Sequence, residues 1–149
     1  MASLPSPSPE QLSQAVATLH HLQKLCGLVE GAADDHDYRD NMVKFNRLLH
    51  RSPGYHALVD RIVRSVDTFP LTDLAFVMMS LRRFEEPLSS PVMQAAFVRL
   101  RRNIDRLDVE ALSFFSVSLH SRFLSFFHSR ETEPLARHSL LQVRMMMLI

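Results

Sequence analysis

Glycine, cysteine and lysine are scarce in this sequence of 149 residues, and each scarcity excludes something. Three glycines allow few tight hairpin turns and cannot build a glycine-rich phosphate loop. The single cysteine, Cys26, excludes a disulfide within the chain and favours a reducing compartment. Its neighbours Leu22, Leu25 and Val29 predict a buried, inert thiol. No apolar run reaches the ~18 residues of a membrane span, so no membrane partner is expected.

The abundant residues favour a helical domain. Hydrophobic residues make up 46% of the chain and charged residues 22%, which is enough to fold one domain around a core. Leu, Met, Ala and Arg are abundant and favour helix. We therefore expect an all-α chain, with a flexible Pro/Ser-rich leader over residues 1–8 and an α-helical repeat domain over residues 9–149. The leader has no Arg or Lys and does not have the composition of a signal or transit peptide.

Start signals for helices recur along the chain. Each is a Ser, Thr or Asp in the cap position, and the serines are followed by Pro at the first helical position: Ser8, Ser52, Thr72, Ser90 and Asp108. Gln11 is expected to close a capping box with Ser8. Apolar residues then follow at steps of three and four, as on one face of a helix. In the first two helices these positions are Leu12, Val16, Leu19, Leu22, Cys26 and Val29, then Met42, Phe45, Leu48 and Leu49. In the helix that begins at Leu71, the inward residues are expected to be Leu74, Val77, Met78 and Leu81. The acidic residues 31–40 between them read as a loop that enters the second helix.

A repeat of 38 residues connects two of the expected helices. Four positions match at this spacing, in the pairs Leu74–Leu112, Phe76–Phe114, Ser80–Ser118 and Leu81–Leu119. A period of this length with two helices per unit is typical of an α-solenoid, because one helical pair cannot bury its own apolar face. We expect helix–turn–helix repeats stacked as a short α-solenoid of about seven helices, the last of them from about Thr132. The alternative is a chance match within a helical bundle of the same helix count. The uncapped apolar ending "MMMLI" is typical of a fragment of a longer array or of an alternative end.

One helix pair follows a recognisable rhythm. Its first helix has the form L-x-D-L-x-x-x-x-x-S-L, and the matching residues are Leu71, Asp73, Leu74, Ser80 and Leu81. Its second helix begins at Ser90 and Pro91. From about residue 40 to 128 the chain resembles the helical-repeat region of the FAST kinase-like family, mitochondrial RNA-binding proteins with heptatricopeptide- or octotricopeptide-type repeats. The resemblance implies RNA binding on a concave surface, a role in mitochondrial RNA processing or stability, and a mitochondrial location. The leader departs from this pattern because it is not Arg-rich, which leaves the cytoplasm as the alternative location. The family's C-terminal nuclease-like domain is also missing.

The basic residues are mostly arginine, with 15 Arg against Lys24 and Lys44 at a net charge of +1. Arginine offers a planar fork that suits phosphate. The candidates for phosphate contact are Arg82, Arg83, Arg99, Arg101, Arg102 and Arg106. Antiparallel packing would place Arg82 and Arg83 at one edge and the others at the opposite edge. Cations near helix C-termini also stabilise the helix dipole, so both interpretations stay open.

Readout of RNA bases would come from polar or stacking side chains on the inner helix faces. The positions expected for this role are Met79, Ser80, Arg83, Ser116, Ser118 and Arg122. Serine and methionine are equally ordinary on a packed helix, so a packing role is the alternative at each position.

Enzymatic chemistry and bound cofactors are not expected. The acidic run Asp34–Asp37 lacks the carboxylate spacing and central Gly of a calcium loop. His20 and His21 are adjacent and face different directions on a helix, so they do not predict a metal site. Kinase triplets and a Gly-flanked serine elbow are both missing from the sequence.

Two functions remain. The first is a non-catalytic repeat segment that binds single-stranded RNA, and the second is a helical scaffold that holds a protein partner's helix or peptide in its groove. An RNA binder needs an Arg-lined groove and steep salt dependence, whereas a peptide-binding scaffold needs an apolar groove and little salt dependence.

Overall fold

The computed structural model describes residues 5–28 and 35–119, and its regular elements in these ranges are helices. Its six α-helices are α1 (Pro9–Leu28), α2 (Asp35–His50), α3 (Pro53–Ser65), α4 (Leu71–Arg83), α5 (Pro91–Arg102) and α6 (Val109–Leu119). Two 3-10 turns follow α3 and α5, at η1 (Val66–Thr68) and η2 (Ile104–Arg106). The all-α prediction is confirmed, with six helices in the described ranges instead of about seven in the whole chain. The last expected helix, from about Thr132, lies outside these ranges.

Local capping explains where two of the helices begin. At α1 the backbone N–H of Ser8 donates to Oε1 of Gln11 at 2.9 Å, and the N–H of Gln11 donates to Oγ of Ser8 at 3.3 Å. This is the predicted capping box. At α6 the N–H of Ala111 donates to Oδ1 of Asp108 at 2.7 Å, which confirms Asp108 as a cap.

Three other predicted caps act differently. Ser52 and Ser90 occupy the N-cap positions of α3 and α5, but neither side chain bonds the helix. Proline follows each of them, and its fixed φ begins the helix without a side-chain cap. The cap of α4 is Pro70, not Thr72. The hydroxyl of Thr72 instead donates to Oδ2 of Asp108 at 3.0 Å and joins the start of α4 to that of α6.

The start of α2 also differs from the sequence prediction, since residues 35–40 are helical and were expected to be a loop. Asp37 lies in the first turn, where the partial positive charge of the helix N-terminus stabilises a carboxylate.

The 38-residue repeat is longer than its four matched pairs. Residues 52–81 and 90–119 align without a gap, and ten of these thirty positions are identical. Corresponding elements begin 38 residues apart, as α3 and α5, η1 and η2, and α4 and α6 do. We call residues 52–81 unit 1 and residues 90–119 unit 2. Each unit therefore runs from a Ser-Pro helix through a 3-10 turn to a second helix.

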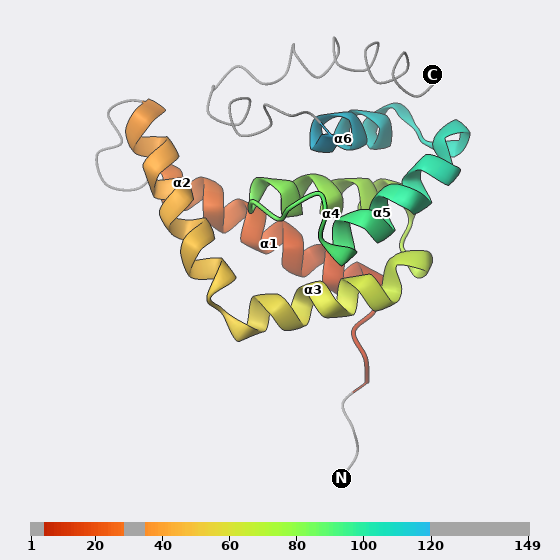
Figure 1. The fold of residues 1–149 in the computed structure, drawn as a ribbon, viewed down its shortest axis with the longest axis horizontal. Helices are drawn as coiled ribbons and strands as arrows, with labels where there is room; N and C mark the ends of the chain where they lie inside the picture. The colour runs from red at the N-terminus through yellow and green to blue at the C-terminus, as the bar shows by residue number, and fades with distance from the viewer. Residues whose placement is uncertain (1–4, 29–34, 120–149) are drawn as a thin grey trace.

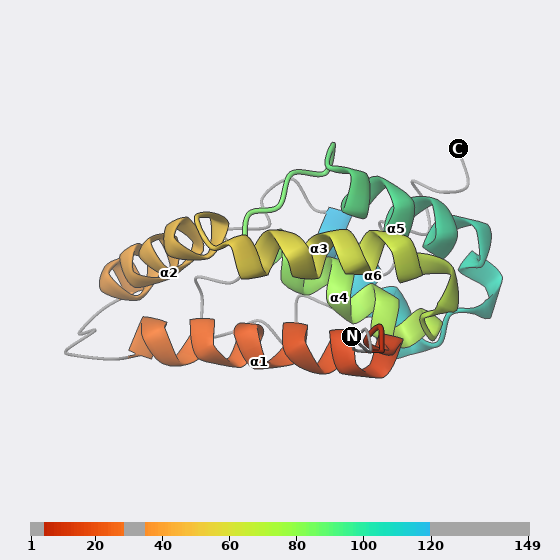
Figure 2. The ribbon, with the colours of Figure 1, turned by 90° about the horizontal axis from the view of Figure 1, so that it is seen from below.

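The two units pack side by side. Helix α4 packs most extensively on α6, α3 packs on α5, and α4 also packs on α5. Helix α1 packs on the side of α4 away from α6, so α1, α4 and α6 follow one another in Figure 1. Helix α2 crosses from the end of α1 to the start of α3 (Figures 1 and 2). Side-by-side units are what a solenoid requires, while a continued solenoid stays a prediction.

The core lies between these helices. It contains the predicted inward residues of α4, namely Leu74, Val77, Met78 and Leu81, with Ile62 of α3, Leu100 of α5 and Phe115 of α6. Fully burying a large apolar side chain stabilises a fold by about 1.5–3 kcal/mol.

The apolar stripes of α1 and α2 were only partly predicted. Leu12, Val16, Met42 and Leu49 are buried as expected. The predictions for Cys26, Leu22 and Leu48 were wrong, because all three side chains are exposed. Polar residues take the buried places on these helices, at Gln23 and Asn46.

Candidate nucleic-acid interface

The residues expected to read RNA bases lie inside the helical packing. Met79, Ser80, Arg83, Ser116 and Ser118 are all buried, and Arg122 lies outside the described ranges. The hydroxyl of Ser118 donates to the carbonyl of Phe115 at 2.7 Å, and Ser80 lies 3.1 Å from Nδ1 of His20. In this structure these side chains contact the protein itself instead of lining a surface.

Arg83 is the centre of a buried polar cluster between α1, α2 and α4. Only 3% of its surface is exposed. Its Nε donates to Oε1 of Gln23, and its Nη2 donates to the hydroxyl of Tyr38 at 3.1 Å. Burial lowers the pKa of Arg83, and Tyr38 opposes that shift. We call Gln23, Tyr38, Asn46 and Arg83 the Arg83 cluster.

The same cluster holds the C-terminal end of α4. The backbone carbonyl of Arg83 accepts from Nε2 of Gln23 and from Nδ2 of Asn46, both at 3.1 Å. The carbonyl of Phe84 accepts from Nε2 of His50 at 2.6 Å. Helix C-terminal carbonyls have no partners within their own helix, so these side chains satisfy them. The cluster is therefore a structural joint.

A row of rings crosses the layer formed by α1, α4 and α6. The ring centroids of His20 and Phe76 lie 5.6 Å apart, as do those of Phe76 and Phe114. Phe76 and Phe114 are equivalent residues of units 1 and 2, and His20 extends the row onto α1. Burial lowers the pKa of His20 to about 3, and the nearby charges of Arg83 and Lys24 act in the same direction.

Two of the predicted arginines contact backbone carbonyls. Nη1 of Arg82 donates to the carbonyl of Glu86 at 3.0 Å. Nη1 of Arg99 donates to the carbonyl of Val66, which joins α5 of unit 2 to the 3-10 turn of unit 1. Both arginines are partly buried, so each has a structural role at the end of a helix.

The remaining predicted arginines are exposed and lie near the end of α5. Arg101, Arg102 and Arg106 fall in this group. Helices α4 and α5 run in opposite directions, so Arg82 and Arg83 lie at the other end of their helix pair, as the sequence predicted (Figure 1).

Two further exposed arginines, on the helix that packs on α5, were missed by sequence reasoning. Arg61 and Arg64 lie on α3 and are exposed. The 38-residue spacing is the signal that could have found them, since it pairs Arg61 with Arg99 and Arg64 with Arg102. Because α3 packs on α5, Arg64 and Arg102 occupy equivalent places on neighbouring helices.

We call Arg61, Arg64, Arg101, Arg102 and Arg106 the arginine row. Acidic residues Asp60, Asp67 and Asp105 lie within three residues of its members in sequence and are also exposed. The row is therefore moderately positive and able to contact a few phosphates of a polyanion, as guanidinium groups do.

Within residues 5–28 and 35–119, His, Cys, Asp and Glu side chains do not form a group of three or more that could hold a metal ion. Over the same ranges, the helices are too short or too polar to cross a membrane. No family model matches the chain, and no curated protein or solved structure is significantly similar to it.

Proposed function

We propose that this chain is a helical-repeat segment that binds single-stranded RNA and acts in mitochondrial RNA processing or stability, without catalysing a reaction. The observation that carries the proposal is the equivalence of Arg64 and Arg102, exposed at the same place on the neighbouring helices of two 38-residue units. A surface that repeats from unit to unit suits a ligand that also repeats, as the phosphates of a strand do. The resemblance to the FAST kinase-like repeats supports the cellular role.

The row differs from the surface that the sequence predicted. Base readout was expected from inner helix faces, where the structure buries the candidate side chains. The arginine row offers contacts to phosphates, which position a strand and carry no sequence information. We therefore expect binding with little sequence preference.

Fluorescence anisotropy of a labelled single-stranded RNA pool tests this proposal. The double variant Arg64→Gln/Arg102→Gln removes the repeated pair. At about 0.7 per phosphate contact, the slope of log affinity against log salt should fall by about 1.4. The control Lys24→Gln/Arg39→Gln makes the same charge change at two exposed positions outside the row and should leave the slope within error. Equal losses in both variants would show that net charge, and not the row, governs binding.

The alternative function, a protein-binding scaffold, has one observation in its favour. Leu22 and Leu25 are 44% and 45% exposed on one side of α1, next to the exposed Cys26. A partner helix could cover such a strip. A folded chain that fails to bind RNA at low salt would favour this alternative, and Leu22→Gln/Leu25→Gln would then be expected to abolish partner binding.

A further inference from the structure

Helix α2 carries a second basic surface that the sequence motifs did not reveal. Lys44 and Arg47 lie in its C-terminal half, Arg51 directly follows its last residue, His50, and the three recur at steps of three and four residues and are all exposed. At these steps, side chains lie on one side of a helix. The chain has no acidic residue between Asp40 and Asp60. We call Lys44, Arg47 and Arg51 the α2 face.

Buried anchors on the other side of α2 fix the orientation of this face. Met42, Asn46 and Leu49 are buried, and Asn46 also bonds the carbonyl at the end of α4. The helix therefore cannot roll without breaking the Arg83 cluster. A charged surface held in one orientation loses little conformational entropy when it binds.

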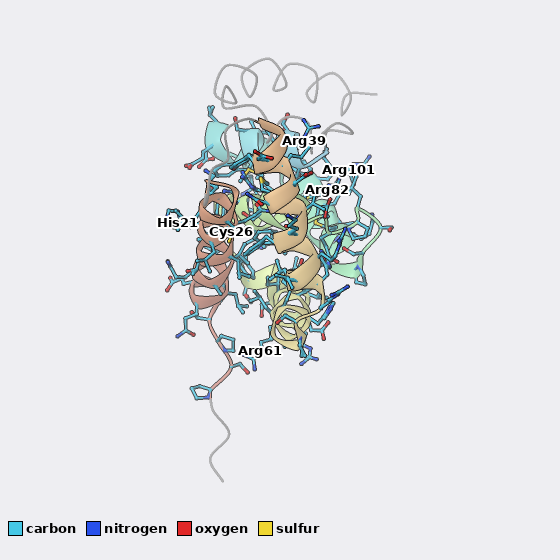
Figure 3. The ribbon with its side chains drawn as sticks, turned by 90° about the vertical axis from the view of Figure 1, so that its left-hand side faces the viewer. His21, Cys26, Arg39, Arg61, Arg82 and Arg101 are labelled. Carbon is cyan, nitrogen blue, oxygen red and sulfur yellow. The ribbon has the colours of Figure 1, made fainter. Side chains whose placement is uncertain are left out.

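The α2 face leads directly into the helix that carries the start of the arginine row. Helix α2 ends two residues before α3, and α3 carries Arg61 and Arg64. Between Asp40 and Asp67 there is one acidic residue, Asp60, against five Lys or Arg residues. Figure 3 shows Arg39 near the N-terminal end of α2 and Arg61 beside α3, the helix that follows the C-terminal end of α2. The 13 residues of α3 span about 20 Å.

We propose that the α2 face contacts the phosphate backbone of the same RNA strand that binds the arginine row. This inference rests on the proposed RNA binding and extends it to a strand that passes along the exposed side of α3. It predicts a minimum length, because a strand of a few nucleotides reaches one basic surface, whereas a longer strand reaches both.

Charge complementarity favours a polyanionic strand over a membrane. A helix that lies on a lipid surface needs a broad apolar face beside its basic residues. On α2 the most exposed large apolar side chain is Leu48, with 67% of its surface exposed, and one such residue does not make a broad apolar face. Lys44 follows Asp40 by one helical turn, a spacing at which opposite charges attract, so Arg47 and Arg51 are the main expected contacts.

The test compares RNAs of about 6 and about 20 nucleotides, within and beyond the site size of one small binding module. The wild-type chain should bind the longer RNA more tightly and with a steeper salt slope. In Arg47→Gln/Arg51→Gln the slope for the longer RNA should fall by about 1.4, and the gain in affinity with length should shrink. Lys24→Gln/Arg39→Gln serves as the matched control, with one of its changes on α2 itself.

The possible failures are distinguishable. A wild-type chain that binds neither RNA contradicts the proposed function. Binding that Arg64→Gln/Arg102→Gln weakens and Arg47→Gln/Arg51→Gln does not would overturn the α2 inference alone. Binding to phosphatidylserine vesicles that Arg47→Gln/Arg51→Gln abolishes, with RNA affinity unchanged, would also overturn it and assign the face to a membrane. Circular dichroism of each variant checks that the helices remain folded.

Discussion

Arg83 is the last residue of α4 and Arg102 is the last residue of α5, yet the two side chains have opposite environments. Arg83 is 3% exposed and bonds Gln23 and Tyr38, whereas Arg102 lies in solvent. The difference comes from the neighbours, because α1 and α2 pack against the end of α4. An arginine at a helix end is therefore structural where another helix covers that end, and is available to a ligand where none does.

The largest expected effect comes from removing the buried arginine. Arg83→Ala leaves a cavity and strands the polar groups of the Arg83 cluster, so the free energy of unfolding should fall by about 3 kcal/mol. Arg102→Ala removes an exposed side chain and should change it by less than about 0.5 kcal/mol. Urea unfolding followed by circular dichroism measures both. Similar losses in the two variants would contradict the division into structural and available arginines.

The contact of Tyr38 with α1 depends on Gly27. A Cβ atom at Gly27 would overlap three carbons of the Tyr38 ring. Gly27→Ala should therefore displace Tyr38 from Arg83 and destabilise the fold by about 1–3 kcal/mol. At Gly54 a Cβ would meet Oγ of Ser52 at 3.5 Å, an ordinary van der Waals contact, so Gly54→Ala should be neutral or stabilise by up to about 1 kcal/mol. Equal changes in stability at the two glycines would argue against this packing.

Acid should weaken the joint between α1 and α4 through His20. The folded state holds the pKa of His20 near 3, while the unfolded chain has the ordinary value of 6.5. The unfolded state therefore binds more protons between these values, so stability is full above pH 6.5 and declines as the pH falls toward 3. The loss should reach about 1–2 kcal/mol near pH 5. In His20→Phe, which restores the residue type of Phe76 and Phe114, the decline between pH 7 and 5 should be smaller by that amount. An unchanged pH profile in His20→Phe would show that protonation of His20 is not the cause of the loss of stability in acid.

The smallest expected effect separates two buried serines of α6. Within residues 5–28 and 35–119, Oγ of Ser116 has no hydrogen-bond partner, whereas Oγ of Ser118 donates to the carbonyl of Phe115. Ser116 is equivalent to Met78 of unit 1, an apolar core position. Ser116→Ala should stabilise the fold by about 0.5–1 kcal/mol, and Ser118→Ala should be neutral or destabilising. Thermal unfolding of the pair gives the sign, and a loss of stability in Ser116→Ala would show that its hydroxyl has a role.

Local signals predicted much of the fold. The capping box at Ser8, the Ser-Pro starts at Ser52 and Ser90 and the aspartate at Asp108 correctly place four helix starts, because these signals act within one turn. The core side of α4 was also predicted, since its apolar residues recur at helical spacing.

The candidate site was predicted less well, for a physical reason. Periodicity shows which residues share a side of a helix, but it does not show which neighbour packs there. Gln23 and Asn46 are buried because they bond the end of α4, and Cys26 is exposed as a consequence of the same orientation of α1. The sequence alone could not show that Arg83 is buried and Arg102 is exposed, because it does not show that α1 covers the end of α4. When the 38-residue alignment is extended to both helices of each unit, it pairs Arg61 and Arg64 with two of the predicted arginines and so identifies them as candidates.

The salt dependence of RNA binding tests the central claim most directly. The wild-type chain is titrated into labelled single-stranded RNA of about 20 nucleotides at several salt concentrations, with circular dichroism on the same sample. If the five arginines of the row contact phosphates, log affinity should fall linearly with log salt, with a slope of about −3.5 from the row alone and about −4.9 when Arg47 and Arg51 also contact the strand. A folded, helical chain with no affinity for RNA at low salt, or with an affinity independent of salt, would contradict the claim.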